Sequence, residues 1–190
     1  MKYDIVLSGV GGQGVLSMAG IIGRAAIAEG LNAKQSEVHG MAQRGGAVSA
    51  HLRLGSGPIA SDLIPRGAAN LILGMEPVES LRALGYLAAG GTLVTAVNAL
   101  VNIPDYPEMD GVLAKLRALP HAFLVDAELL AREAGDVLAM NTVMVGAAAH
   151  LLPLKMESLE QAIERTFAGK DAFTLAANRA AFRAGRGTAA

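Results

Sequence analysis

The stretch that decides the fold is Tyr3-Asp4-Ile5-Val6-Leu7-Ser8, followed directly by Gly9-Val10-Gly11-Gly12-Gln13-Gly14. The first six residues form a short apolar run rich in β-forming side chains, and residues 15–29 have the pattern of a helix with few polar positions. Gly9, Gly11 and Gly14 meet the pattern G-x-G-x-x-G. The chain therefore opens with a predicted strand, a glycine turn and a helix that packs back on the strand.

This glycine loop is a candidate anion site, because free N–H groups at a helix start favour a phosphate or a carboxylate. The residues that would build it are Gly9, Gly11, Gly12, Gln13 and Gly14. The alternative is that the glycines only permit close packing of helix on strand. A dinucleotide site also needs an acidic residue at the end of the second strand. Glu37 stands at about the right distance, but the sequence places it inside a loop.

That loop is the second informative stretch, Ser36-Glu37-Val38-His39-Gly40-Met41-Ala42-Gln43-Arg44-Gly45-Gly46. Glycines so close together weaken a strand or a helix, so residues 36–46 are predicted to be a loop. Side chains of this kind in a loop suit contact with a ligand or a partner chain. The candidate residues are Glu37, His39, Gln43 and Arg44. The alternative is a surface turn whose charges are solvated.

Composition narrows the class of protein. The 190 residues suit one domain, predicted over residues 1–185 with a frayed tail at 186–190, and 16 basic against 17 acidic residues leave no basic stripe for nucleic acid. The chain has no cysteine, which excludes disulfides, cysteine nucleophiles and thiolate ligation of zinc or Fe–S clusters, and its four histidines lack metal-ligand spacing. No signal peptide or membrane span is expected, so a cytoplasmic location is the default.

Further along the chain, strand and helix patterns alternate. Residues 46–54 predict a strand with one polar face, 55–58 a turn, and 59–61 a returning hairpin strand. Gly90 and Gly91 are expected to end the unit that begins with the helix at 77–87. Other strands are expected at 70–75, 92–97 and 122–126, and other helices at 111–119, 127–134, 140–152, 157–167 and 171–183. The alternation predicts an α/β fold: a Rossmann-like, doubly wound, mainly parallel sheet with helices on both faces and a helical C-terminal part.

Two asparagines join the candidate site. Asn98 follows the strand at 92–97, and doubly wound folds place ligand contacts at the carboxyl ends of their strands. Asn141 stands at the start of the helix at 140–152, where helix capping is the alternative role.

Three motifs together carry a resemblance: the glycine loop from Gly9 to Val15, the run from Glu37 to Gly46, and Gly74-Met75-Glu76-Pro77. They resemble the gamma-type domain of the 2-oxoacid:ferredoxin oxidoreductases, most closely the small beta subunit of the indolepyruvate enzymes. The helix start Asn141-Thr142-Val143-Met144-Val145-Gly146 is similar as well, so the resemblance spans nearly the whole chain.

The resemblance implies a subunit of an enzyme that decarboxylates an aryl-pyruvate, passes electrons to ferredoxin and transfers the acyl group to coenzyme A. Thiamine diphosphate, Mg and Fe–S clusters would belong to a large partner subunit, in agreement with the absence of cysteine here. Glu37, His39, Gln43 and Arg44 would line the face toward that partner or the coenzyme. Arg44 would hold a phosphate or carboxylate, and His39 would make a hydrogen bond across the interface.

Two other functions stay open on the sequence alone. One is a free-standing NAD(P)-binding dehydrogenase, which the glycine loop favours. The other is a non-catalytic interaction module of the same fold. The choice of 2-oxoacid, including pyruvate, and the pairing of the isolated chain with itself as a homodimer are also left open.

Overall fold

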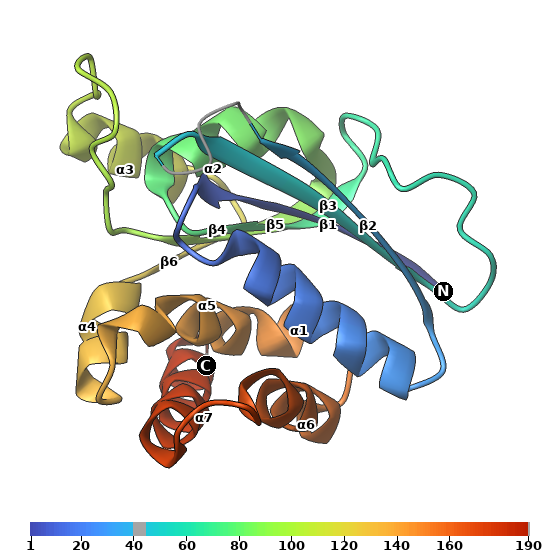
Figure 1. Cartoon of the computed structure of the whole chain (residues 1–190). Helices are drawn as coiled ribbons and strands as arrows, with labels where there is room; N and C mark the ends of the chain where they lie inside the picture. The colour runs from blue at the N-terminus through green and yellow to red at the C-terminus, as the bar shows by residue number, and fades with distance from the viewer. Residues whose placement is uncertain (40–44, 190) are drawn as a thin grey trace.

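The computed structural model describes residues 1–39 and 45–189, and its centre is a six-stranded sheet of order β2-β3-β1-β4-β5-β6 (Figure 1). The strands are β1 Lys2–Val10, β2 Asn32–His39, β3 Ala47–Gly55, β4 Ala69–Gly74, β5 Leu87–Ala96 and β6 Ala122–Val125. β1, β4, β5 and β6 pair in parallel, whereas β3 is antiparallel to both β1 and β2. The predicted mainly parallel sheet is confirmed, with one reversed strand inside it.

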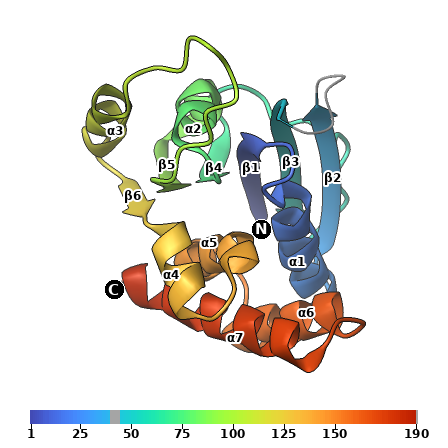
Figure 2. The same cartoon turned by 60° about the vertical axis from the view of Figure 1, so that its left-hand side comes forward.

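Helices cover both faces of this sheet, unequally (Figure 2). They are α1 Val15–Ala28, α2 Pro77–Ala83, α3 Met109–Arg117, α4 Ala127–Glu133, α5 Met140–Ala148, α6 Met156–Phe167 and α7 Ala172–Arg186. α2 and α3 lie on one face, and α1, α4 and α5 lie on the other with α6 and α7 behind them. Within the described residues, none of the helices has the length and apolar character needed to cross a membrane.

Each face of the sheet has its own core. Ile5 and Leu7 of β1 belong to the larger core, packed with α1 and α5, whereas Val6 between them belongs to the smaller core beneath α2 and α3. All three side chains are fully buried. Burial on both faces is why the opening strand is a continuous apolar run rather than an alternating one.

Two predicted loop or break positions are strands instead. Residues 36–39 belong to β2, because they pair in register with β3, Glu37 opposite Ala50 and His39 opposite Val48. Gly90 and Gly91 do not end a unit but lie inside β5. The pairing of β4 with β5 shifts register between Ala69 and Leu71, and a Cβ at Gly91 would lie 2.7 Å from the Ala69 carbonyl oxygen. Gly91 thus allows the backbones of β4 and β5 to approach each other closely.

Two other expectations were wrong as well. Residues 59–61 form no strand, because Arg53 holds this segment through its side chain: Nη1 donates to the carbonyls of Ser61 and Leu63 at 3.0 and 2.9 Å. The helix expected at 140–152 ends at Ala148 and continues as a 3-10 turn over Ala149–Leu151. At the far end, α7 reaches Arg186 and a 3-10 turn covers Gly187–Ala189.

His51 on β3 gives the fold a predicted pH dependence. Its Nδ1 accepts a hydrogen bond from the Ile64 N–H at 2.9 Å. The pKa of His51 is lowered, first by burial and then by the positive charge of Arg53. The negative charges of Asp62 and Asp4 oppose this shift, but their effects are smaller. In the unfolded chain the pKa of His51 is about 6.5, and in the folded chain it is lower. The stability contributed by neutral His51 is therefore present above pH 6.5 and is lost as the pH falls below that value. Denaturant titrations at pH 7.5 and pH 5.5 should show a smaller pH-induced loss of unfolding free energy in His51→Gln than in the wild type. Equal losses would contradict the prediction.

Candidate functional site

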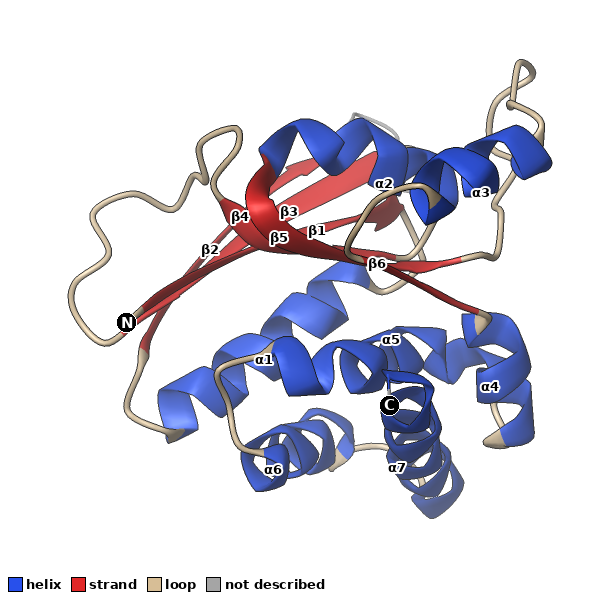
Figure 3. Ribbon diagram, turned by 180° about the vertical axis from the view of Figure 1, so that it is seen from behind, coloured by secondary structure: helices blue, strands red, loops and turns tan. Residues whose placement is uncertain are grey.

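Several of the predicted site residues that the structure describes lie at one edge of the sheet. β1, β4 and β5 are parallel, so the glycine loop after β1, the Met75-Glu76-Pro77 segment after β4 and Asn98 after β5 share the carboxyl edge. α5 lies on the same face of the sheet as α1 (Figure 3), and Asn141 near its start contacts Gly14 of the loop. After β1 the chain passes to one face of the sheet, and after β4 it passes to the other. The edge between β1 and β4 is therefore the switch point at which doubly wound folds bind their ligands.

The glycines of the loop are needed for close packing. A Cβ at Gly9 would lie 2.8 Å from Val15 and 3.0 Å from Met75, so this residue lets α1 and the end of β4 approach β1. Gly14 precedes α1 with φ +80°, and a Cβ there would lie 2.6 Å from the Asn141 side-chain nitrogen. The packing role that the sequence left as an alternative is thus present at both positions.

Gln13 closes the crevice between β1 and β4. Its Oε1 accepts a hydrogen bond from the Val10 N–H at 2.8 Å, and its Nε2 donates to the Met75 carbonyl at 3.3 Å. The side chain therefore joins the ends of two neighbouring strands. A ligand at this edge would meet Gln13 as part of the wall.

The glycine loop is also joined to the second glycine-rich stretch. The Gly11 N–H donates to the Gly46 carbonyl at 2.8 Å, and the Gly45 N–H donates to the Gly11 carbonyl at 3.3 Å. The Asn102 side chain donates to the Gly45 carbonyl at 2.8 Å. The two motifs that the sequence singled out are therefore held together by backbone hydrogen bonds.

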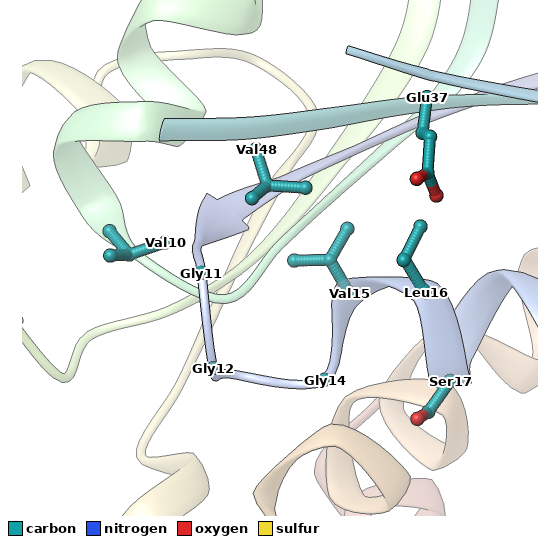
Figure 4. Close-up of a pocket in the computed structure, with 9 residues that line it drawn as sticks. All are labelled: Val10, Gly11, Gly12, Gly14, Val15, Leu16, Ser17, Glu37 and Val48. Carbon is teal, nitrogen blue, oxygen red and sulfur yellow. The ribbon is translucent and has the colours of Figure 1, made fainter. Parts of the chain in front are cut away.

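A cavity of about 400 Å³ opens beside the start of α1 (Figure 4). Its walls include Gly11, Gly12 and Gly14, the first residues of α1, and Glu37. No side chain caps α1, so the N–H groups of its first turn are open to an anion at one end of the cavity. Figure 4 shows the Glu37 carboxylate pointing from the opposite wall toward Leu16.

The position of Glu37 corrects the sequence interpretation. The residue is on β2, two positions before the strand ends, and not in a loop. Its side chain reaches the cavity of the glycine loop although β3 separates β2 from β1 in the sheet. An acidic group thus faces the glycine loop, which is the arrangement that suits recognition of ribose hydroxyls.

The two asparagines have different surroundings. Asn98 donates to the Asp126 carboxylate at 3.0 Å and accepts from the Glu128 N–H at 3.1 Å, and it lines a smaller cavity of about 230 Å³ together with Gln13 and Leu138. Asn141 is buried within α5, whose N-cap residue is Ala139, and its Oδ1 accepts from the Thr142 N–H at 2.9 Å. Asn141 is therefore no N-cap; it packs against Gly14 and supports the loop from behind.

Two predicted site residues, Gln43 and Arg44, lie outside the described residues. The backbone of His39 belongs to β2, but its side chain is outside the described part of the chain. Among the described residues, no group of three or more His, Cys, Asp or Glu side chains could hold a metal ion.

Glu76 is a buried acidic residue at this edge that the sequence analysis did not rank as a site residue. It is the N-cap of α2, where Oε2 accepts from the Glu79 N–H at 2.8 Å, and Oε1 accepts from the Tyr106 hydroxyl. Burial and this bond to Glu76 raise the pKa of Tyr106. A Glu followed by Pro at a helix start was the available signal, since Pro is favoured in the first turn.

Comparison with known proteins identifies the family of the chain. The family described as Pyruvate ferredoxin/flavodoxin oxidoreductase matches residues 4–188. Indolepyruvate oxidoreductase subunit IorB of Archaeoglobus fulgidus is 38% identical over 90% of this chain and 88% of its own length. The protein of the same name from Methanothermobacter thermautotrophicus is 37% identical over 100% of this chain and 99% of its own length.

Solved structures share the fold. The gamma subunit of a keto/oxoacid ferredoxin oxidoreductase from Geobacter sulfurreducens is 25% identical, with a TM-score of 0.72 over 98% of both chains. A 2-oxoglutarate:ferredoxin oxidoreductase from Magnetococcus marinus, solved with 2-oxoglutarate, coenzyme A and succinyl-CoA bound, superposes with a TM-score of 0.76 at 20% identity; this chain covers 31% of that one. The family resemblance drawn from the motifs is confirmed: the chain belongs to the pyruvate ferredoxin/flavodoxin oxidoreductase family.

Proposed function

We propose that this chain is the small subunit of a heteromeric 2-oxoacid:ferredoxin oxidoreductase that converts an aryl-pyruvate such as indolepyruvate to an acyl-CoA, with release of CO₂ and reduction of ferredoxin. The observation that carries the proposal is the match, at 38% identity over 88% of its length, to a relative named Indolepyruvate oxidoreductase subunit IorB. The chain alone would be inactive, and the assembled complex would work in the cytoplasm.

The large partner subunit would supply thiamine diphosphate, Mg and the Fe–S clusters. This division of labour suits a chain without cysteine, because Fe–S clusters are held by cysteine thiolates. When bound, thiamine diphosphate provides the carbanion stabilisation that decarboxylation of a 2-oxoacid needs. The carboxyl edge, with the glycine loop and Asn98, would face that partner.

Coenzyme A would contact the cavity beside α1. The uncapped start of α1 and the glycine backbone suit a phosphate group, and the Glu37 carboxylate on the opposite wall suits hydroxyl donors. A molecule that carries both groups, as coenzyme A does, fits these two walls. Gly11, Gly12, Gly14 and Glu37 are the residues assigned to this contact.

Co-purification tests the proposal directly. A tagged copy of the chain is isolated from its own cells, the accompanying proteins are identified, and dye reduction is measured with indolepyruvate, coenzyme A and thiamine diphosphate. We expect a large, cysteine-rich, thiamine-binding partner and activity that depends on all three compounds. A chain that purifies alone and without such activity would contradict the proposal.

Arg44 is the residue proposed to hold a phosphate or carboxylate, because its planar guanidinium can donate two parallel hydrogen bonds. Arg44→Ala should lower kcat/KM of the reconstituted complex by about tenfold or more, since a hydrogen bond to a charged group contributes about 1.5–3 kcal/mol. The melting temperature of the isolated subunit should not change. Arg179→Ala, at an exposed ion pair with Glu164, is the matched control. Unchanged turnover in Arg44→Ala would remove this role.

The second candidate function is an NAD(P)-dependent dehydrogenase. The specific observation in its favour is that Glu37 faces the glycine loop across one cavity, as a ribose-binding acid would. Calorimetric titration of the isolated chain with NAD and NADP separates the two functions. Tight binding of either nucleotide, reduced by Glu37→Gln, would favour the dehydrogenase.

A further inference from the structure

A cavity of about 490 Å³ lies on the face of the sheet opposite the α1 helix. It opens between β3 and the α2 helix, and its lining includes Ser8, Ser49, His51, Leu63, Arg82 and Tyr86. The volume is within the range of small-molecule sites. Glu37 lines the cavity beside the glycine loop and Val38 lines this one, because the two side chains point to opposite faces of β2. Val48 on β3 borders both cavities.

The floor of the cavity holds an unsatisfied hydroxyl. Ser8 on β1 is 2% exposed, and its Oγ has no hydrogen-bond partner among the described residues. Ser49 stands directly opposite Ser8 in the β1–β3 pairing and lines the cavity as well. A buried polar group without a partner costs about 1–3 kcal/mol. A ligand that brings a hydrogen-bonding atom to Ser8 would offset that cost.

Aromatic and apolar side chains form part of the wall. The rings of Tyr86 and His51 meet edge to face, with centroids 5.0 Å apart and planes at 74°. Leu63 and Val38 line the same cavity and are 55% and 64% exposed. A planar aromatic ring would cover these groups.

Arg82 places a positive charge at the rim. Its Nη1 donates to the Glu79 carboxylate at 2.6 Å, and its side chain is 56% exposed whereas that of Glu79 is 8% exposed. The Nε and Nη2 hydrogens have no acceptor among the residues that the structure describes. The guanidinium can therefore donate to a second carboxylate from outside while it neutralises Glu79.

We propose that this cavity is a binding site for a small aromatic carboxylate. The ring lies against Tyr86 and Leu63, the carboxylate accepts from Arg82, and a polar ring atom reaches Ser8. Indole-3-acetate is a suitable probe, because its ring N–H can donate to Ser8 Oγ. The site lies on the opposite face of the sheet from the cavity beside the glycine loop. It borders the same carboxyl edge, because Ala47 and Val48 in its wall pair with Val10 and Gly9.

The chain contains no tryptophan, so indole emission excited beyond the tyrosine absorption comes from the probe alone. Titration of indole-3-acetate with the full chain, followed by fluorescence anisotropy, should show saturable binding. Arg82→Gln should weaken binding about tenfold or more, because it removes a hydrogen bond to a charged group. Arg179→Gln, which also breaks an ion pair on a helix surface, should bind like the wild type. Tryptamine, with a cation in place of the carboxylate, should bind more weakly than indole-3-acetate.

Ser8→Ala is a second variant in which weaker binding would not result from a loss of folding stability. This variant should melt at a higher temperature than the wild type, because it deletes the unpaired buried hydroxyl, and yet bind indole-3-acetate several-fold more weakly. Absence of saturable binding by the wild type would overturn the proposal. Equal affinities in Arg82→Gln and Arg179→Gln would also overturn it. Neither result would affect the oxidoreductase assignment, which the co-purification tests separately.

Discussion

Gly185→Ala is expected to lower the free energy of unfolding by about 3 kcal/mol or more, the upper end of what overpacking costs. Gly185 lies on α7 where that helix crosses α5. A Cβ built there would overlap the Val143 carbonyl oxygen and lie 2.8 Å from its carbon and 3.0 Å from the Ala147 nitrogen. These are backbone atoms, so no side-chain rotation can relieve the overlap, and the two helices must separate.

Gly146 makes the same contact from the other helix. A Cβ on it would overlap the Phe182 carbonyl oxygen and lie 3.0 Å from the Arg186 nitrogen. Gly146→Ala should therefore be as destabilising as Gly185→Ala. The double variant should cost less than the sum of the two, because one separation of the helices relieves both overlaps.

Gly20→Ala is the matched control for these variants. Gly20 is also inside a helix, but the nearest atom to a Cβ there is the end of the Arg24 side chain at 3.8 Å. This change should stabilise the protein by about 0.5–1 kcal/mol, since alanine is the better helix former. Urea unfolding followed by circular dichroism measures all four variants. A Gly185→Ala protein as stable as the wild type would show that the close crossing of α5 and α7 is absent.

Local signals in the sequence predicted the parts of the fold that depend on short-range order. The glycine loop from Gly9 to Gly14 and the buried strands at 70–75, 92–97 and 122–126 have apolar runs and turn residues that act within a few positions. The positions of these elements in the structure follow that prediction to within a few residues, apart from the earlier start of β5. The family motifs are likewise contiguous in sequence and were recognisable without the fold.

Pairing between distant segments could not be predicted in this way. β3 lies between β1 and β2, and its pairing with β2 joins residues that are up to 23 positions apart. Because of this pairing, Glu37 belongs to a strand and not to the expected loop, and its side chain lines the cavity beside the glycine loop. Gln13 was identified as a loop residue, but its bond to Met75 joins positions 62 residues apart. The cavity around Ser8 combines β1, β3 and α2, and no single stretch of sequence carries its pattern.

Arg53→Met is the second change with a large expected effect, a loss of about 3–5 kcal/mol in the free energy of unfolding. Asp4 is 1% exposed, and Arg53 donates to both of its carboxylate oxygens, from Nε at 2.9 Å and from Nη2 at 3.2 Å. Removal of the guanidinium leaves this carboxylate buried, with the mostly exposed Lys2 at 3.1 Å as its remaining cation. The variant also frees residues 61–63, whose carbonyls Arg53 holds.

The double variant Asp4→Asn/Arg53→Met separates these two contributions. Loss of the negative charge removes the unpaired carboxylate but not the release of residues 61–63, so the double variant should be more stable than Arg53→Met alone and less stable than the wild type. Urea unfolding gives the free energies, and proteolysis at residues 59–64 reports the loop on its own. If the double variant is no more stable than Arg53→Met, then the loop carbonyls and not Asp4 are the main partners of Arg53. In that event Arg53 fastens the segment that carries Leu63 onto the sheet, and its loss should weaken the binding of indole-3-acetate as well.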